Sequence, residues 1–275
     1  MTSTHSSPSA SRLAPLRGIV RYRSFILGSV KRELQVRYRS STLGAAWLVL
    51  QPLAQILVFT LIFTEIMRPR LPGIAGSFGY SIYLCAGVLT WGLFSEIVTR
   101  FQTMFLDNAN LLKKISFPRM CLPAIVVANS LVSFSIVFAL FVGFLLLTNS
   151  FPGWSFFSLA PLLVLLVAFA IGLGVGLGVL NVFFRDVGQA MAIVLQFWFW
   201  LTPIVYPVSV LPPWAKEAVH FNPVTPLISA FQVVLTGQGL PDWMSLLPLT
   251  LIAACLCIGS LALFRRRAAE MVDEL

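Results

Sequence analysis

Six long apolar runs divide the chain, and each is bounded by polar or charged residues. They cover residues 45–67, 80–102, 120–147, 157–182, 189–206 and 244–264, with these bounds approximate. A helix of about 20 residues crosses the roughly 30 Å hydrocarbon core of a bilayer, and the runs are near this length. They are apolar on every side, unlike the alternating strands of a membrane β-barrel. The pattern predicts an all-α integral membrane protein with six transmembrane helices.

The segments outside these runs differ in character. Residues 1–20 are rich in Ser, Pro and Ala and hold no apolar core of a cleavable signal peptide, which predicts a disordered leader. Residues 207–240 are rich in Pro, and their apolar part is too short to cross a bilayer, which predicts a re-entrant helical segment. Residues 44–265 then form one transmembrane domain, followed by a tail at 266–275.

The stretch at residues 21–43 predicts an amphipathic helix in the membrane interface. Its cations, among them Arg32, Arg37 and Arg39, lie on faces that suit anionic lipid headgroups. A solvated basic leader is the alternative interpretation. The apolar residues that recur at helical spacing are Phe25, Ile26, Val30 and Leu34.

Composition and charge support the membrane interpretation. The chain is 58% hydrophobic and 11% charged, whereas soluble domains are about 45–50% apolar and about 25% charged. With the N-terminus inside, only Arg68, Arg70 and Lys216 of the 19 basic residues fall in outer connections. The positive-inside rule therefore predicts cytoplasmic termini. The net charge of +9 is explained by this distribution, so we expect membrane lipids and not nucleic acid as partners.

Motifs for catalysis or nucleotide binding are missing from the sequence. It contains no P-loop, no zinc-protease motif and no nucleophile elbow, and its Cys255-x-Cys257 lacks metal-ligand spacing. The two histidines, His5 and His220, stand without a partner pattern. We therefore expect no enzyme activity and no bound cofactor or metal, and energy for transport must come from another polypeptide.

Two predicted spans contain residues that favour local pairing or close packing. Glu96 and Arg100 are four residues apart in the second span, so they share a helix face and can pair. Functional and structural interpretations of this pair both stay open. The fourth span holds Gly172, Gly174, Gly176 and Gly178, whose spacing fits two overlapping G-x-x-x-G patterns. Such patterns let helices approach closely.

The polar connection at residues 107–118 predicts a short helix between two spans. Asp107 or Asn108 suits its start, Lys113 and Lys114 suit its last turn, and Pro118 ends it. A short exposed helix of this kind is a natural docking element for a soluble partner. A plain connector is the alternative.

Four consecutive aromatic residues, 197–200, end the fifth predicted span. Because consecutive residues point around the whole helix, some of these rings must face protein or a pore. Aromatic faces stack on the C–H surfaces of sugars, which makes carbohydrate a candidate ligand. An interfacial aromatic belt is the other interpretation.

Six short motifs occur in order between about residues 30 and 265. They are RELQVRYRSSTLG at 32–44, KKISFPR at 113–119, NVFFRD at 181–186, LTPIVYP at 201–207, NP at 222–223 with PLI at 226–228, and GLPDW at 239–243. Together they resemble the permease subunits of ABC-2 type polysaccharide exporters, in particular the O-antigen permeases. One departure is that Ser229 and Gln232 stand where related permeases often carry a charged residue.

The resemblance implies a homodimer in the bacterial inner membrane, paired with two copies of a separate ABC ATPase that binds ATP and Mg. Hydrolysis would move a lipid-linked polysaccharide between the two permeases. The implied residues at the cytoplasmic entrance are Arg32, Arg37 and Arg39. The implied ATPase-docking residues are Asp107, Asn108, Leu111, Leu112, Lys113 and Lys114. The implied channel residues are Trp47, Trp91, Phe94, Phe197, Trp198, Phe199, Trp200 and Tyr206.

Two other functions remain as alternatives. An ABC-2 permease for drugs or small lipids would share the fold and the need for an ATPase. A membrane-embedded enzyme that acts on lipid-linked sugars would instead need essential acidic or histidine residues at one membrane face. The candidates for such residues are Glu65, Glu96 and His220.

Overall fold

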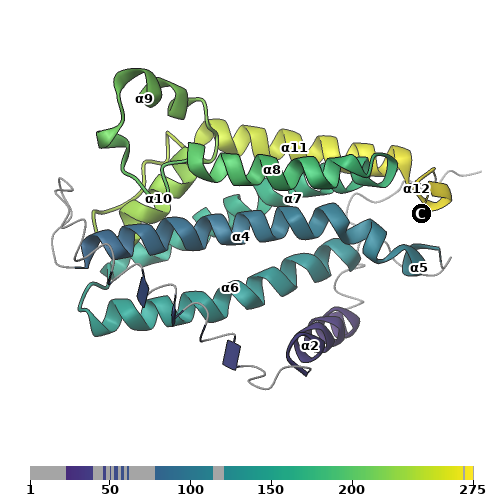
Figure 1. Ribbon diagram of the computed structural model, residues 1–275, viewed down its shortest axis with the longest axis horizontal. Helices are drawn as coiled ribbons and strands as arrows, with labels where there is room; N and C mark the ends of the chain where they lie inside the picture. Colours follow the sequence, from purple (N-terminus) through teal and green to yellow (C-terminus); the bar gives the residue numbers. More distant parts are fainter. Residues whose placement is uncertain are drawn as a thin grey trace, which may run out of the picture.

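A computed structural model describes most of the chain. The described residues are 23–39, 46–47, 50, 53–54, 57–58, 61, 78–113, 121–268 and 270–274. Every regular element among them is helical, as the apolar runs predict. Long helices lie side by side in an elongated bundle (Figure 1). The leader at 1–20 and most of the first predicted span lie outside the described residues.

Four helices are long and apolar enough to cross a membrane. They are α4 (Gly79–Asp107), α6 (Cys121–Leu147), α7 (Leu159–Phe183) with its leading 3-10 turn η2 (Gly153–Ser158), and α11 (Leu247–Arg267). Each coincides with a predicted span. The protein is therefore a multi-pass membrane protein, as expected where lipid acts as the solvent.

The helix observed at the fifth predicted span is shorter than the apolar run there. Helix α8 (Asp186–Leu201) has 16 residues, which corresponds to about 24 Å. It ends where Thr202 takes an extended backbone conformation and Pro203 follows, since the residue before a proline avoids helical geometry. The predicted span runs on to 206, so its last residues lie outside the helix.

After α8 the chain forms a broken helical segment. A 3-10 turn, η3 (Val208–Val210), leads to α9 (Pro213–His220) and then α10 (Thr225–Leu235). The axes of α9 and α10 differ by 100°, as in a broken span or a re-entrant loop. Counting this pair gives up to five candidate spans among the described residues, and the six-span count stays a prediction.

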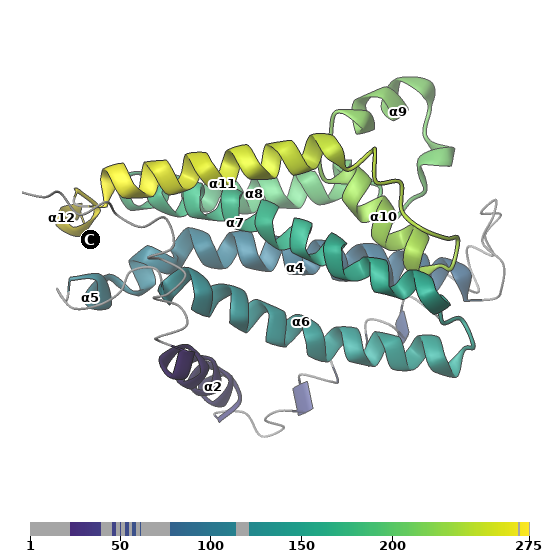
Figure 2. The ribbon, with the colours of Figure 1, turned by 180° about the vertical axis from the view of Figure 1, so that it is seen from behind.

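Helix α2 (Arg23–Arg39) is separate from the main bundle. It packs against α6 and is seen nearly end-on in two opposite views, so it runs across the direction of the long helices (Figures 1 and 2). Ile26 and Val30 are buried, whereas Phe25 and Leu27 are exposed. This arrangement fits a helix along a membrane surface, and its placement in the interface stays a prediction.

Helix α7 is the centre of the bundle because its glycines admit two neighbours. It packs against α4 on one side and α11 on the other. A β-carbon added at Gly174 or Gly178 would lie 2.7 Å or 2.5 Å from Phe101 of α4, and one at Gly172 would lie 2.9 Å from Leu256 of α11. The two overlapping glycine patterns therefore serve different helices, and the predicted close packing is confirmed.

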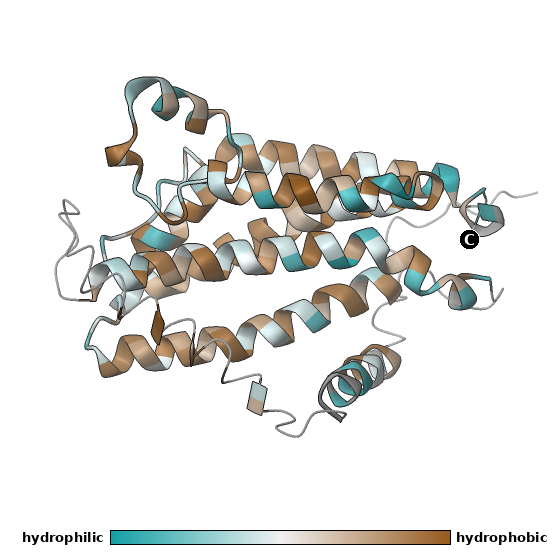
Figure 3. Cartoon of the chain, in the orientation of Figure 1, coloured by the Kyte–Doolittle hydropathy of each residue, from teal (hydrophilic) through white to brown (hydrophobic). Residues whose placement is uncertain are grey.

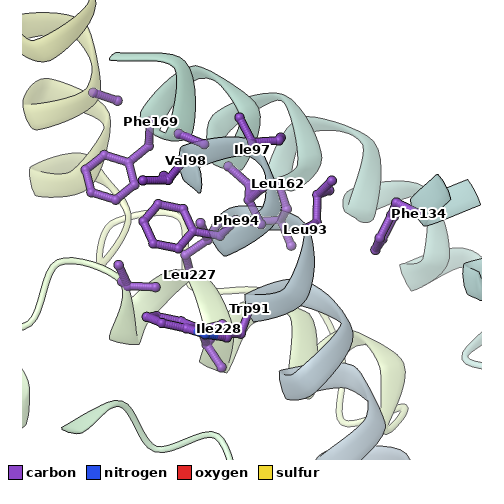
Figure 4. Close-up of a cluster of buried hydrophobic side chains, with 14 of the residues drawn as sticks. Trp91, Leu93, Phe94, Ile97, Val98, Phe134, Leu162, Phe169, Leu227 and Ile228 are labelled. Atoms are coloured by element: carbon purple, nitrogen blue, oxygen red, sulfur yellow. The ribbon is translucent and has the colours of Figure 1, made fainter. Parts of the chain in front are cut away.

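Aromatic and aliphatic side chains fill the space between these helices. Phe94 and Phe169 stack with ring centroids 5.4 Å apart, surrounded by Leu162, Leu227 and other aliphatic residues (Figure 4). Hydrophilic residues gather instead at the end of the bundle that carries α5 and α12 (Figure 3). Helices α5 (Ala109–Leu112) and α12 (Glu270–Glu274) are short.

Candidate functional site

Four polar side chains tie α2 to the bundle, and we call them the interface cluster: Glu33, Glu96, Arg100 and Asn129. Arg100 donates from one terminal nitrogen to Glu33 at 2.5 Å and from Nε to Glu96 at 2.8 Å. Asn129 of α6 donates from Nδ2 to the second carboxylate oxygen of Glu33. The predicted pairing of Glu96 with Arg100 is confirmed, within a larger network.

The sequence analysis missed Glu33 and Asn129. They are separated by 96 residues, so no local pattern joins them. One signal was present, because Glu33 is the only acidic residue in α2. A lone carboxylate on a basic helix is a reasonable candidate for an internal contact, since it cannot share the other residues' attraction to anionic headgroups.

A cavity of about 530 Å³ lies beside the interface cluster, between α2, α4 and α6, and we call it the α2 cavity. Its walls combine charged groups with apolar ones. The lining residues are Phe25, Ser29, Arg32, Glu33, Arg100, Thr103, Met104, Asp107, Asn108, Leu122, Ile125, Val126 and Asn129. Arg32, one of the residues implied at the cytoplasmic entrance, lines this cavity, and its role there stays a prediction. The side chains of Arg37 and Arg39 lie outside the described residues.

The predicted docking loop contains the expected short helix, α5, directly after Asn108, but the Asn108 side chain bonds to α4 and not to α5. Asp107 is the last residue of α4, and the Asn108 side chain donates back to the Met104 carbonyl at 2.9 Å. Asn108 thus satisfies a carbonyl at the end of α4, and both residues line the α2 cavity. The helix that follows, α5, has four residues.

Within this loop, one predicted docking residue is buried and another is exposed. Leu112 is buried, so it belongs to the core of the subunit and is not available to a partner in this conformation. Lys113 is exposed directly after α5. The side chain of Leu111 and the whole of Lys114 lie outside the described residues.

Two predicted channel residues are core residues. Trp91 is 7% exposed and Phe94 is 1% exposed. Their rings contact Trp198 of α8, with centroids 6.0 Å and 5.5 Å away, and Phe199 also contacts Trp91 at 6.0 Å. Hydrophobicity favours burial wherever helices meet, so these rings hold α4 against α8 and do not form an accessible wall.

Other predicted aromatic residues are accessible in the single subunit. Phe197 is 65% exposed and Trp200 is 59% exposed on α8, and Trp47 is also exposed. Tyr206 is partly exposed and donates from its hydroxyl to the Trp200 carbonyl at 2.7 Å. These side chains can contact lipid, a second subunit or a substrate.

A second cavity, of about 510 Å³, lies between α8 and α9, and we call it the outer cavity. Its walls are mainly apolar and include Trp198, Trp214 and Phe221. Both ends of the Asn222 amide form hydrogen bonds. Oδ1 accepts from Trp198 Nε1 at 2.9 Å, and Nδ2 donates to the Thr202 hydroxyl at 2.9 Å. Asn222 therefore fixes the broken segment against α8.

Gln232 fixes the same segment from the other side. Its buried Nε2 lies within hydrogen-bond distance of the Pro203 and Ile204 carbonyls, at 3.4 Å and 3.3 Å. These carbonyls lie beyond the end of α8, so no helix supplies their hydrogen bonds. A neutral amide is suited to this buried position because it donates without bringing a charge into the bundle. The uncharged residue noted in the sequence thus has a structural role.

The sequence model for the ABC-2 type transporter family matches residues 26–236. The O-antigen export system permease protein RfbA of Myxococcus xanthus is 28% identical over 262 residues, which cover 94% of this chain and 98% of that protein. A protein of the same name from Klebsiella pneumoniae is 27% identical over 246 residues, covering 89% and 92% of the two chains.

A polysialic acid transport protein is similar over the same region. The polysialic acid transport protein KpsM of Escherichia coli is 23% identical over 248 residues, covering 88% of this chain and 93% of that protein. The family match includes most of α2, the three long helices α4, α6 and α7, helix α8, and the broken segment as far as α10. Because this match covers well over half of the sequence, the chain belongs to the ABC-2 type transporter family.

Proposed function

We propose that the chain is the channel-forming transmembrane subunit of an ATP-driven exporter for lipid-linked polysaccharide of the O-antigen type. The observation that carries this proposal is the near full-length similarity to permeases named for O-antigen export. A more distant relative is named for polysialic acid transport, so the named substrates are polysaccharides in both cases.

The proposed assembly is a homodimer with two copies of a separate ABC ATPase. The sequence has no P-loop, so ATP and Mg would bind to that partner. Phe197 and Trp200 leave an apolar aromatic surface on α8. Such a surface suits a second subunit on one side of a channel and sugar C–H faces on the other. This arrangement would place transport between two copies of the chain.

The proposed orientation puts the end with α5 and α12 in the cytoplasm. Arg265, Arg266 and Arg267 are exposed at the end of α11, and Lys113 is exposed after α5. Positive charge favours the cytoplasmic side of a bacterial inner membrane. Helices α9 and α10 lie at the opposite end of the bundle (Figure 2) and would face the periplasm.

The export proposal is tested by removing the chain from a cell that makes the polysaccharide. Loss of surface polysaccharide, with lipid-linked polymer accumulating inside, is the expected result, and reintroducing the chain restores both. Normal surface polysaccharide in cells without the chain would refute the proposal. Altered sensitivity to drugs or altered lipid export in those cells would instead favour the small-molecule permease.

The ATPase contact is tested by purifying the tagged chain in mild detergent and measuring what is retained. We expect an ATPase in equal amounts, and its loss in the double variant Lys113→Glu, Lys114→Glu. Arg266→Glu is a matched control, because it reverses an exposed charge at the same end of the bundle. Equal ATPase retention by the double variant and the control would remove the docking role from this loop.

A further inference from the structure

The α2 cavity is lined by polar groups that have no partner among the described residues. Among the described residues, none forms an ion pair or a hydrogen bond with the Arg32 guanidinium or the Asp107 carboxylate. Asn129 is 3% exposed, and its Oδ1 has no hydrogen-bond partner. Buried acceptors in folded proteins nearly always meet a donor. Within the described part of the chain, this acceptor therefore lacks a donor.

The orientation of the Asn129 amide follows from its neighbour. The Glu33 carboxylate only accepts hydrogen bonds, so Asn129 must turn Nδ2 toward it. Oδ1 is left as a buried acceptor on a residue that lines the cavity, next to a carboxylate that already serves Arg100. A ligand group with N–H donors and a positive charge would complement both.

The balance of charge argues against a strongly anionic ligand. The cavity lining holds two cations, Arg32 and Arg100, and two carboxylates, Glu33 and Asp107. Arg100 is already occupied by Glu33 and Glu96, so among the described lining residues Arg32 is the one cation available to an anion. Because Glu33 is paired with Arg100, a diphosphate would meet the Asp107 carboxylate beside one free cation. A ligand with one anionic and one cationic group fits this set better.

The apolar part of the lining indicates that the ligand is an amphiphile. Phe25, Leu122, Ile125 and Val126 form hydrocarbon walls beside the charged groups. The cavity lies between the start of α6 and the last turns of α4, under a helix that crosses the bundle (Figure 1). Helix ends of membrane spans lie at the level of lipid headgroups.

We propose that the α2 cavity binds the headgroup of an aminophospholipid of the phosphatidylethanolamine class. The ammonium group donates hydrogen bonds to the acceptors around Asn129 Oδ1, and the phosphate accepts from Arg32. Asp107 adds negative charge to the lining and strengthens the preference for an ammonium group. This site is independent of the proposed export substrate, because it requires neither ATP nor polysaccharide.

The experiment measures which lipids stay on the purified full-length chain. The chain is exchanged into detergent with equal amounts of phosphatidylethanolamine, phosphatidylcholine and phosphatidylglycerol of identical acyl chains, and retained lipid is counted by native mass spectrometry. We expect phosphatidylethanolamine to exceed each of the others by about five-fold, the size expected for one partly exposed charged contact. Phosphatidylcholine carries the positive charge without N–H donors and therefore isolates the hydrogen bond.

Single substitutions test whether the preference for phosphatidylethanolamine depends on residues of the α2 cavity. Asn129→Leu is expected to abolish the ethanolamine preference, and Asp107→Asn, which alters an exposed side chain without a described contact, is expected to reduce it. Arg32→Gln is expected to lower retention of all three lipids. Asp186→Asn is the control, an exposed carboxylate at the start of α8 and outside the cavity. A loss of folded protein would lower retention of all three lipids alike, so the ratio between lipids within one sample is not affected by it.

Specific outcomes would overturn the proposal. Equal retention of phosphatidylethanolamine and phosphatidylcholine would remove the hydrogen bond as its basis. Stronger retention of phosphatidylglycerol would reverse the inferred charge preference. A preference unchanged in Asn129→Leu, or lost equally in Asp186→Asn, would place the selectivity elsewhere on the protein surface.

Discussion

Gly178 marks the closest approach between α4 and α7, and its replacement by alanine is a direct test of the packing. The added β-carbon would lie 2.5 Å from the Phe101 carbonyl oxygen and 3.3 Å from the Phe105 ring. Because the first of these atoms belongs to the backbone, α4 itself must move. Overpacking of this kind costs about 1–3 kcal/mol, and the higher helix propensity of alanine returns about 1 kcal/mol.

Gly176→Ala separates these two contributions. Gly176 lies on the same helix, and its added β-carbon would meet only Ser260 at 3.7 Å, an ordinary contact. Both variants gain the same helix propensity, so that gain cancels when they are compared. The Gly178→Ala variant should therefore be less stable than Gly176→Ala by about 1–3 kcal/mol.

Thermal unfolding of the full-length chain in detergent micelles measures this difference. At about 2–4 °C per kcal/mol for a chain of this size, the Gly178→Ala variant should melt roughly 2–12 °C below Gly176→Ala. Equal melting temperatures would refute the reasoning, because they would mean that α4 and α7 do not need the close approach. A lower value for Gly176→Ala would refute the assignment of the two glycine faces.

Three further substitutions test polar contacts. Arg100→Ala leaves Glu33 without its cation, so we expect faster amide hydrogen exchange in α2 and unchanged exchange in α11. Asn181→Leu removes a buried side chain that is bonded at both ends, and should cost about 2 kcal/mol of unfolding free energy; unchanged stability would contradict this. Trp198→Phe removes one indole hydrogen bond and should cost about 1 kcal/mol, whereas the exposed Trp200→Phe should be neutral.

Local pattern predicted the elements whose cause is local. Apolar runs of about 20 residues correctly located α4, α6, α7 and α11, because lipid selects such runs one segment at a time. The short apolar stretch after 207 was correctly predicted not to form one straight span, since α9 and α10 meet at 100°. Pairing of Glu96 with Arg100 was predictable because four residues make one helical turn.

Residues of the candidate site were harder to predict where their partners are distant in sequence. In the sequence, hydropathy does not distinguish the aromatic residues at 91, 94 and 198 from those at 197 and 200. Burial separates them in the structure, since Phe94 meets α7 and α8 while Phe197 faces outward. Hydropathy describes a residue's affinity for an apolar environment and does not say whether lipid, substrate or another helix provides it.

The sequence alone determines the class of protein and its main spans, because these depend on the transfer of apolar residues from water to lipid. It also determines the likeness to a transporter family, because that likeness depends on short motifs. The three-dimensional arrangement decides which face of each helix is covered. It brings Glu33 of α2 to Arg100 of α4 and Asn129 of α6, and it forms the α2 cavity between them. Such contacts join residues 67 and 96 positions apart, and helix packing sets them through shape rather than through any periodicity of the chain.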